Sequence, residues 1–187
     1  MKRIMIASLF LIIGCREEKK ETSVPTEPQV NQVKENVVES KTEEDLSVNE
    51  SKEAGTWLEK NMVSYFKTDL GNLDKEMQKI TTKDYYEYKT DAMSVDMDVD
   101  GSLTEKEFTE KWKSRFDTQK AGTGIGFLIS GQDWDNITVK SCELKSSSKD
   151  AYIFNVVLAD DNLKAKYPSV IKVVKENGSF LIADVLQ

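Results

Sequence analysis

The 187-residue sequence contains no histidine, and this absence excludes several kinds of catalytic and metal site. Serine–histidine triads, cysteine–histidine pairs, histidine-ligated zinc sites and histidine general bases all need an imidazole ring. An enzyme built from this chain would have to rely on aspartate or tyrosine side chains. No recognisable catalytic motif accompanies those residues, so the sequence favours a protein that binds over one that catalyses.

An excess of positive charge is also lacking. The chain carries 26 lysine and arginine residues against 33 aspartate and glutamate residues, which gives a net charge of −7. Nucleic-acid-binding domains carry a basic patch, and no such patch interleaved with aromatic residues is visible here. The same balance argues against docking on an anionic membrane surface by charge. We therefore expect no nucleic-acid partner.

The N-terminal apolar run, residues 4–13, is too short to span a bilayer. It follows Lys2 and Arg3 and has the length typical of a secretory signal peptide. The run ends in Ile12-Ile13-Gly14-Cys15, which resembles the lipobox of bacterial lipoproteins. This resemblance implies cleavage after residue 14 and acylation of Cys15, so that the lipid bilayer becomes a partner of the mature protein.

The residues that follow Cys15 bear on where the protein is located. Arg16 stands where many inner-membrane lipoproteins have a retaining aspartate. The charged run 16–20 is similar to a short signal that directs some lipoproteins to the outer face of the cell. The resemblance implies a lipid-anchored protein of the bacterial cell envelope, in the outer membrane, on its periplasmic or surface face.

Residues 16–53 have the composition of a tether. They contain 11 acidic and 6 basic residues and no aromatic residue. Such a segment buries too little apolar surface to offset its ordering entropy, although a transient helix over 37–46 is conceivable. We predict a signal peptide (1–14), the lipidated Cys15 with a disordered acidic tether (15–53), and one domain (54–187).

The most specific motif is an acidic loop at residues 96–107, Asp-Met-Asp-Val-Asp-Gly-Ser-Leu-Thr-Glu-Lys-Glu. Its three aspartates, spaced two residues apart, would repel one another unless a cation lay between them. A glycine in the middle allows the sharp turn that brings later ligands to the same ion. Calcium prefers oxygen ligands, and the candidate ligands are Asp96, Asp98, Asp100, Ser102, Thr104 and Glu107.

The acidic loop and its flanks resemble a calcium-binding EF-hand. Phe108, Trp112 and Phe116 recur every four residues, which predicts an exit helix over 104–119. Thr104 and Glu107 also form the pattern of a helix-start capping box. EF-hands usually occur in pairs, and the chain contains no second loop of this kind. A solvated acidic turn between two helices is the alternative.

The hydrophobic period of the domain changes from helical to extended along the chain. Helical spacing covers 54–70 and 73–80, and Thr82 could cap a third helix that leads into the acidic loop. Apolar residues then alternate at 125–129, 137–139, 151–158, 170–174 and 180–185, and Asn177-Gly178 is a strong hairpin turn signal. We predict an α+β domain whose N-terminal helices pack on a C-terminal antiparallel sheet of about four strands. This order resembles NTF2-like and cystatin-like domains.

Two functions fit these observations. The first is a membrane-anchored calcium-binding lipoprotein with a non-enzymatic binding or structural role. The alternative is an NTF2-like carrier or enzyme with an aromatic pocket, in which residues 96–107 are only an acidic turn. The aromatic residues available for such a pocket are Trp57, Tyr65, Phe66 and the cluster at 85–88, although at helical spacing such residues more often form a core.

Overall fold

The structure is a computed structural model that describes residues 43–131 and 133–186. The predicted signal peptide, Cys15 and the tether up to residue 42 lie outside these residues. The helices are α1 (Glu43–Phe66), α2 (Leu73–Ile80), α3 (Lys83–Met93) and α4 (Glu105–Trp112), with short 3-10 turns η1 (Leu70–Asn72) and η2 (Thr118–Lys120). The strands are β1 (Ile137–Ser148), β2 (Ala151–Asp160), β3 (Ala165–Glu176) and β4 (Ser179–Leu186).

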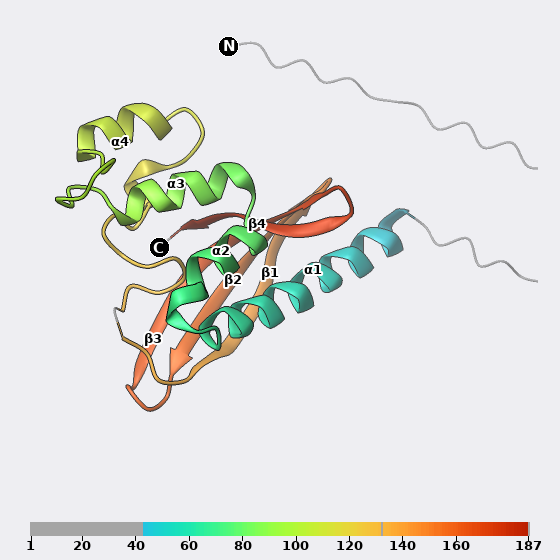
Figure 1. The fold of residues 1–187 in the computed structure, drawn as a ribbon. Coiled ribbons are helices and arrows are strands. Elements are labelled where there is room, and N and C mark those ends of the chain that lie inside the picture. The colour runs from blue at the N-terminus through green and yellow to red at the C-terminus, as the bar shows by residue number, and fades with distance from the viewer. Residues whose placement is uncertain (1–42, 132, 187) are drawn as a thin grey trace, which may run out of the picture. The chain divides into compact units, whose positions relative to one another are not determined.

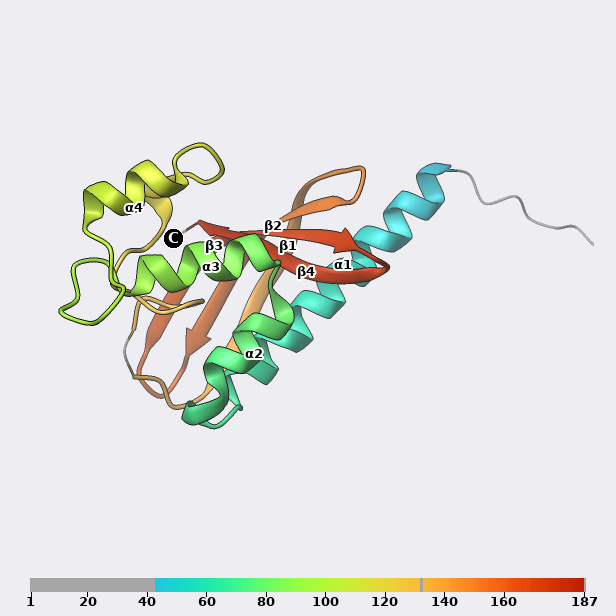
Figure 2. The same cartoon turned by 45° about the horizontal axis from the view of Figure 1, so that its top comes forward.

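The four strands form one antiparallel sheet in the order β1-β2-β3-β4. Helix α1 packs against β1, β2 and β4, whereas α2 and α3 pack against β4. In both views α4 lies at the opposite end of the domain from the start of α1 (Figures 1 and 2). The predicted α+β class, with helices first and an antiparallel sheet after them, is confirmed.

Side chains alternate along β2, as expected for a strand with one face in the core. The residues between the core positions are more exposed and belong to the opposite face of the sheet. The core-facing set is Tyr152, Phe154, Val156 and Leu158. The predicted hairpin at Asn177-Gly178 is also confirmed, because both residues are left-handed, with φ of 51° and 81°, as a two-residue turn of this kind requires.

The first helix begins earlier than predicted. Residues 43–53, assigned to the tether from their composition, are helical in the structure. Ser51 and Ala54 are buried, and Glu50 forms an ion pair with Lys175 of β3. These tertiary contacts supply the stabilisation that the local composition lacks. The helix also ends at Phe66, four residues short of the predicted end at residue 70, and Leu70 is exposed.

Two further predictions are wrong. The alternating segment 125–129 is not a strand: it lies in a loop, where Phe127, Leu128 and Ile129 are all buried. Three consecutive residues cannot all face one side of a strand, because side chains alternate between its two faces. The exit helix predicted for 104–119 ends at Trp112, and the chain continues through a turn into η2, whose start is capped by Asp117.

Among the described residues, no helix combines the length and the apolar character needed to cross a membrane.

Candidate metal centre

The acidic loop, residues 96–107, joins α3 to α4. Helix α3 begins at the predicted cap, because the Thr82 hydroxyl accepts a hydrogen bond from the Tyr85 amide at 3.2 Å. Helix α4 begins inside the loop with the predicted capping box, in which the Glu107 amide donates to Thr104 Oγ1 and the Thr104 amide donates to Glu107 Oε2. Local sequence signals therefore fix the start of both flanking helices.

An aromatic cluster holds the two helices together. The Tyr88 ring of α3 stacks on Phe108 of α4, with centroids 5.4 Å apart, and on Phe116, with centroids 4.2 Å apart. Trp112 meets the same tyrosine in a T-shaped arrangement, with centroids 5.5 Å apart. The predicted apolar face of 108, 112 and 116 is thus used as expected, although Phe116 lies beyond the end of the helix. Such aromatic contacts contribute beyond the area that they bury.

Asp91 is a charged residue of α3 at its contact with α4. Its Oδ2 accepts a hydrogen bond from the Trp112 indole at 2.7 Å and contacts the Lys111 ammonium at 2.6 Å. A charge-assisted hydrogen bond of this kind is stronger than a neutral one. Asp91 therefore fixes α4 against α3, a positioning role that the sequence pattern did not reveal.

The backbone of the acidic loop turns back on itself. Asp96 and Gly101 both adopt left-handed conformations, with φ of 57° and 84°. The Asp96 amide donates to the Leu103 carbonyl at 3.0 Å, and the Ser102 amide donates to the Val99 carbonyl at 3.1 Å. Gly101 thus makes the sharp turn expected of it, and Asp96 and Leu103 lie side by side.

The carboxylates of the loop do not converge. Asp96, Asp98 and Asp100 are exposed, and no three acidic or cysteine side chains in the described part of the chain come together as a ready ligand set. Glu107 Oε2 instead accepts hydrogen bonds from the amide and hydroxyl of Thr104 at 2.9 and 2.8 Å, and these bonds lower the pKa of Glu107. The Ser102 hydroxyl donates to the Met97 carbonyl.

The donor set of the loop suits a hard cation. Every candidate ligand atom is an oxygen, and four of the six candidate residues carry a carboxylate. Calcium takes six to eight oxygen ligands in flexible geometries, which fits a solvent-exposed loop better than it would fit a rigid octahedral site. The residues present therefore match calcium in chemistry and order.

The C-terminal end of α3 is anchored from behind by residues 121–124. Lys89 is only 1% exposed, and its ammonium donates to the carbonyls of Ala121 and Gly122 at 2.8 and 3.1 Å. The Gly124 amide donates to the Ala92 carbonyl at 2.9 Å. Burial lowers the pKa of Lys89 to about 8. Nothing in the sequence marks this lysine, because its partners are backbone groups of a distant segment.

The aromatic residues considered for a ligand pocket lie mostly in the core. Tyr65, Phe66 and Tyr85 are buried, and the rings of Tyr65 and Tyr85 both contact Phe127. Trp57 is half-buried and lies against Phe180 of β4. Each ring therefore has protein neighbours that account for its position.

Outside the acidic loop, the carboxylate of Asp160 at the end of β2 is fully buried. Hydrogen bonds from the backbone amides of residues 135, 163, 136 and 162 lower the pKa of Asp160. They tie the segment before β1 to the turn between β2 and β3. An anion held by four amides is fully satisfied, so Asp160 serves the fold and offers no free acid or base.

Comparisons of the chain with protein-family models, curated proteins and solved structures gave no significant match. The resemblances to lipoproteins, to the EF-hand and to NTF2-like domains stay predictions. Function is therefore inferred from the acidic loop, its flanking helices and the N-terminal sequence.

Proposed function

We propose that this protein is a membrane-anchored, calcium-binding lipoprotein whose α+β domain has a non-enzymatic binding or structural role. The observation that carries the proposal is the acidic loop itself. It fills every liganding position of a calcium loop and lies between two helices that are already capped and packed against each other.

Each residue of the loop has a defined role in this proposal. The carboxylates of Asp96, Asp98 and Asp100 supply charge at positions 1, 3 and 5. Ser102 offers its backbone carbonyl, Thr104 acts through a water molecule, and Glu107 closes the set with both carboxylate oxygens. Bound calcium would supply the positive charge that removes the repulsion among the three aspartates.

Glu107 connects the ion to the fold. Glu107 Oε2 caps α4 through Thr104, whereas Glu107 Oε1 has no hydrogen-bond partner within the described residues. Oε1 is therefore the oxygen free to bind first, and binding through both oxygens would require Oε2 to turn from Thr104 toward the ion. Because Asp91 and the aromatic cluster hold α4 on α3, an ion bound to Asp96 and Glu107 would link the end of one helix to the start of the next. We infer that calcium stabilises the helical part of the domain.

The proposed membrane anchor rests on the sequence of the N-terminal region. Cleavage before Cys15 and acylation of its thiol would leave the domain on an acidic tether at the bilayer surface. Mass spectrometry of the membrane fraction should show a chain that begins at a lipid-modified Cys15. A chain that still begins at Met1 would contradict the anchor.

Metal analysis tests the proposed ligand directly. We would dialyse a chain starting at residue 16 against equal concentrations of calcium and magnesium and measure both metals in the retained protein. One calcium ion per chain is expected at millimolar calcium, with a dissociation constant on the order of 10⁻⁴ to 10⁻³ M, as in extracellular modules. Magnesium should compete poorly because it demands shorter bonds and a rigid octahedron. Equal occupancy by magnesium, or retention of neither metal, would contradict the proposal.

A further inference from the structure

The two edges of the sheet differ in how far other parts of the chain cover them. The edge of β4 is met by the chain before α3, where Thr81 bridges Ile182 and the Thr82 amide donates to the Ile182 carbonyl at 2.8 Å. The edge of β1 has no strand beside it within the described residues. An unpaired edge presents a row of free amides and carbonyls that can accept another strand.

Irregularities limit the usable part of the β1 edge. The pairing of β1 with β2 shifts register between Val139 and Ser141 and again between Leu144 and Ser146. Such bulges twist an edge and discourage pairing along it. Residues 137–139 precede the first bulge and are regular, so the start of β1 is the part of this edge best able to accept a strand.

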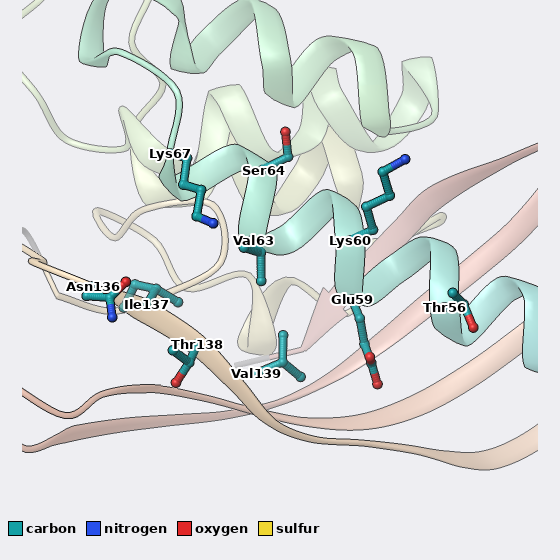
Figure 3. A pocket seen from close by; sticks show the side chains of 10 residues that line it. All are labelled: Thr56, Glu59, Lys60, Val63, Ser64, Lys67, Asn136, Ile137, Thr138 and Val139. Atoms are coloured by element: carbon teal, nitrogen blue, oxygen red, sulfur yellow. The ribbon is translucent and has the colours of Figure 1, made fainter.

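A groove of about 670 Å³ runs between this part of β1 and helix α1. We call it the edge groove. Ile137, Val139 and Val63 give it an apolar floor, and Figure 3 shows Val63 and Val139 pointing toward each other across it. The groove is open to solvent along one side, so it suits side chains of a segment that lies along the edge of the sheet.

The two ends of the edge groove carry opposite charges. Glu59 points from α1 toward β1 near Val139, and Lys67 points toward the other end of the groove near Asn136 (Figure 3). Neither the Glu59 carboxylate nor the Lys67 ammonium has an ion-pair or hydrogen-bond partner within the described residues. Lys67 directly follows the last residue of α1, and eight residues of helix correspond to about 12 Å along its axis.

That spacing matches an extended chain. Side chains at positions i, i+2 and i+4 of a strand point to the same side and span about 13 Å. In a segment with oppositely charged residues at i and i+4 and an apolar residue at i+2, the charged side chains could therefore pair with Glu59 and Lys67 while the apolar side chain contacts the floor of the groove. Antiparallel pairing is slightly more stable than parallel pairing, and it would place the N-terminal charge beside Glu59.

We propose that the edge groove binds an extended peptide segment of another protein by strand addition to β1. The segment has a basic residue at its N-terminal end, an apolar residue in the middle and an acidic residue at its C-terminal end. Main-chain hydrogen bonds to residues 137–139 hold it, and Glu59 and Lys67 set its direction. This site lies on α1 and β1 and is independent of the acidic loop.

Fluorescence anisotropy with the full chain in detergent micelles tests this site. The probe is an end-blocked, fluorescein-labelled peptide, Lys-Thr-Val-Thr-Glu, compared with the reversed sequence Glu-Thr-Val-Thr-Lys. The first should bind saturably and roughly two- to fivefold more tightly, the contribution of an exposed ion pair. Methylation of the backbone nitrogens that face β1 should abolish binding, since it removes the ladder donors.

Charge exchange sharpens the test. The double variant Glu59→Lys, Lys67→Glu should prefer the reversed peptide. Lys52→Glu is the matched control, because Lys52 is exposed on the same helix and does not line the groove, and this variant should keep the wild-type preference. All three proteins should show the same melting temperature. Absence of saturable binding, an unchanged preference after the exchange, or full binding of the methylated peptide would overturn the proposal.

Discussion

Two regions of the domain differ in the contacts that stabilise each of them internally: the helical lobe (residues 83–120), and the sheet with α1. In the sheet, alternating apolar residues such as Phe154 and Ile171 are buried against α1 and against each other. In the helical lobe, the aromatic cluster is positioned by charged groups, with Asp91 bound to Trp112 and Lys89 bound to backbone carbonyls. The sheet and α1 therefore depend mainly on apolar burial, with polar contacts such as Glu50–Lys175 at their margins, whereas the lobe depends on a few polar contacts next to its aromatic cluster and, in our proposal, on an ion.

The largest expected loss of stability comes from a substitution in the core of the sheet. Phe154→Ala removes a ring that is only 2% exposed and should lower the free energy of unfolding by about 3–5 kcal/mol. Urea denaturation followed by circular dichroism measures this change. Leu163→Ala, at an exposed position, is the control and should change stability by less than about 0.5 kcal/mol. A loss of calcium affinity in a folded Phe154→Ala protein would show that the two regions are not separate.

The next effect concerns the lobe. Asp91→Ala leaves the indole of Trp112 and the ammonium of Lys111 without their acceptor, and should cost about 2 kcal/mol. It should also weaken calcium binding, because α4 is no longer fixed against α3. Asp84→Ala, which breaks an exposed ion pair with Arg115, is the matched control and should cost less than about 1 kcal/mol. Equal losses in the two variants would contradict the positioning role of Asp91.

The lowered pKa of Lys89 should make the free energy of unfolding depend on pH. Its pKa in the folded protein is about 8, below the ordinary lysine value of 10.5, because burial disfavours the charged form. Between these two values the unfolded chain binds more protons, so stability should rise with pH, with a slope that approaches 1.4 kcal/mol per pH unit. Subtracting the free energy of unfolding of Lys89→Met from that of the wild type at each pH isolates the contribution of Lys89 from those of other groups that titrate in this range, such as tyrosines. A difference that stays flat between pH 8 and 10 would contradict it.

The smallest effect separates capping from the proposed ligand role. Thr104→Ala removes the N-cap of α4 and should cost about 1 kcal/mol without calcium, whereas Thr104→Ser should be close to neutral. Thermal melting in the presence of a chelator measures both. If Thr104→Ala is as stable as the wild type, the capping box does not contribute to the lobe.

Features that depend on neighbouring residues could be predicted from the sequence. The caps at Thr82 and Thr104, the turn at Asn177-Gly178 and the alternation along β2 all act locally, and each is present in the structure. The face of Phe108 and Trp112 was predicted for the same reason.

Features that depend on distant partners could not be predicted. The start of α1 is fixed by contacts such as that of Glu50 with Lys175 of β3, which composition does not reveal. Lys89 and Asp160 are buried because backbone groups from other segments satisfy them. The alternation at 125–129 suggested a strand, but left-handed glycines at 122 and 124 precede it and the chain enters the core as a loop.

The most direct test of the central claim is a calcium titration followed by thermal melting. A chain starting at residue 16 would be compared with Glu107→Gln, which keeps a residue able to complete the capping box but removes the ligand charge. Glu105→Gln, in the same turn of α4 but outside the ligand positions, is the control. Calcium at about 100 times its dissociation constant should add roughly 2.7 kcal/mol to the stability of the wild type and of Glu105→Gln, and little to that of Glu107→Gln. No change in the wild type up to about ten millimolar calcium would contradict the proposal and leave residues 96–107 as an acidic turn.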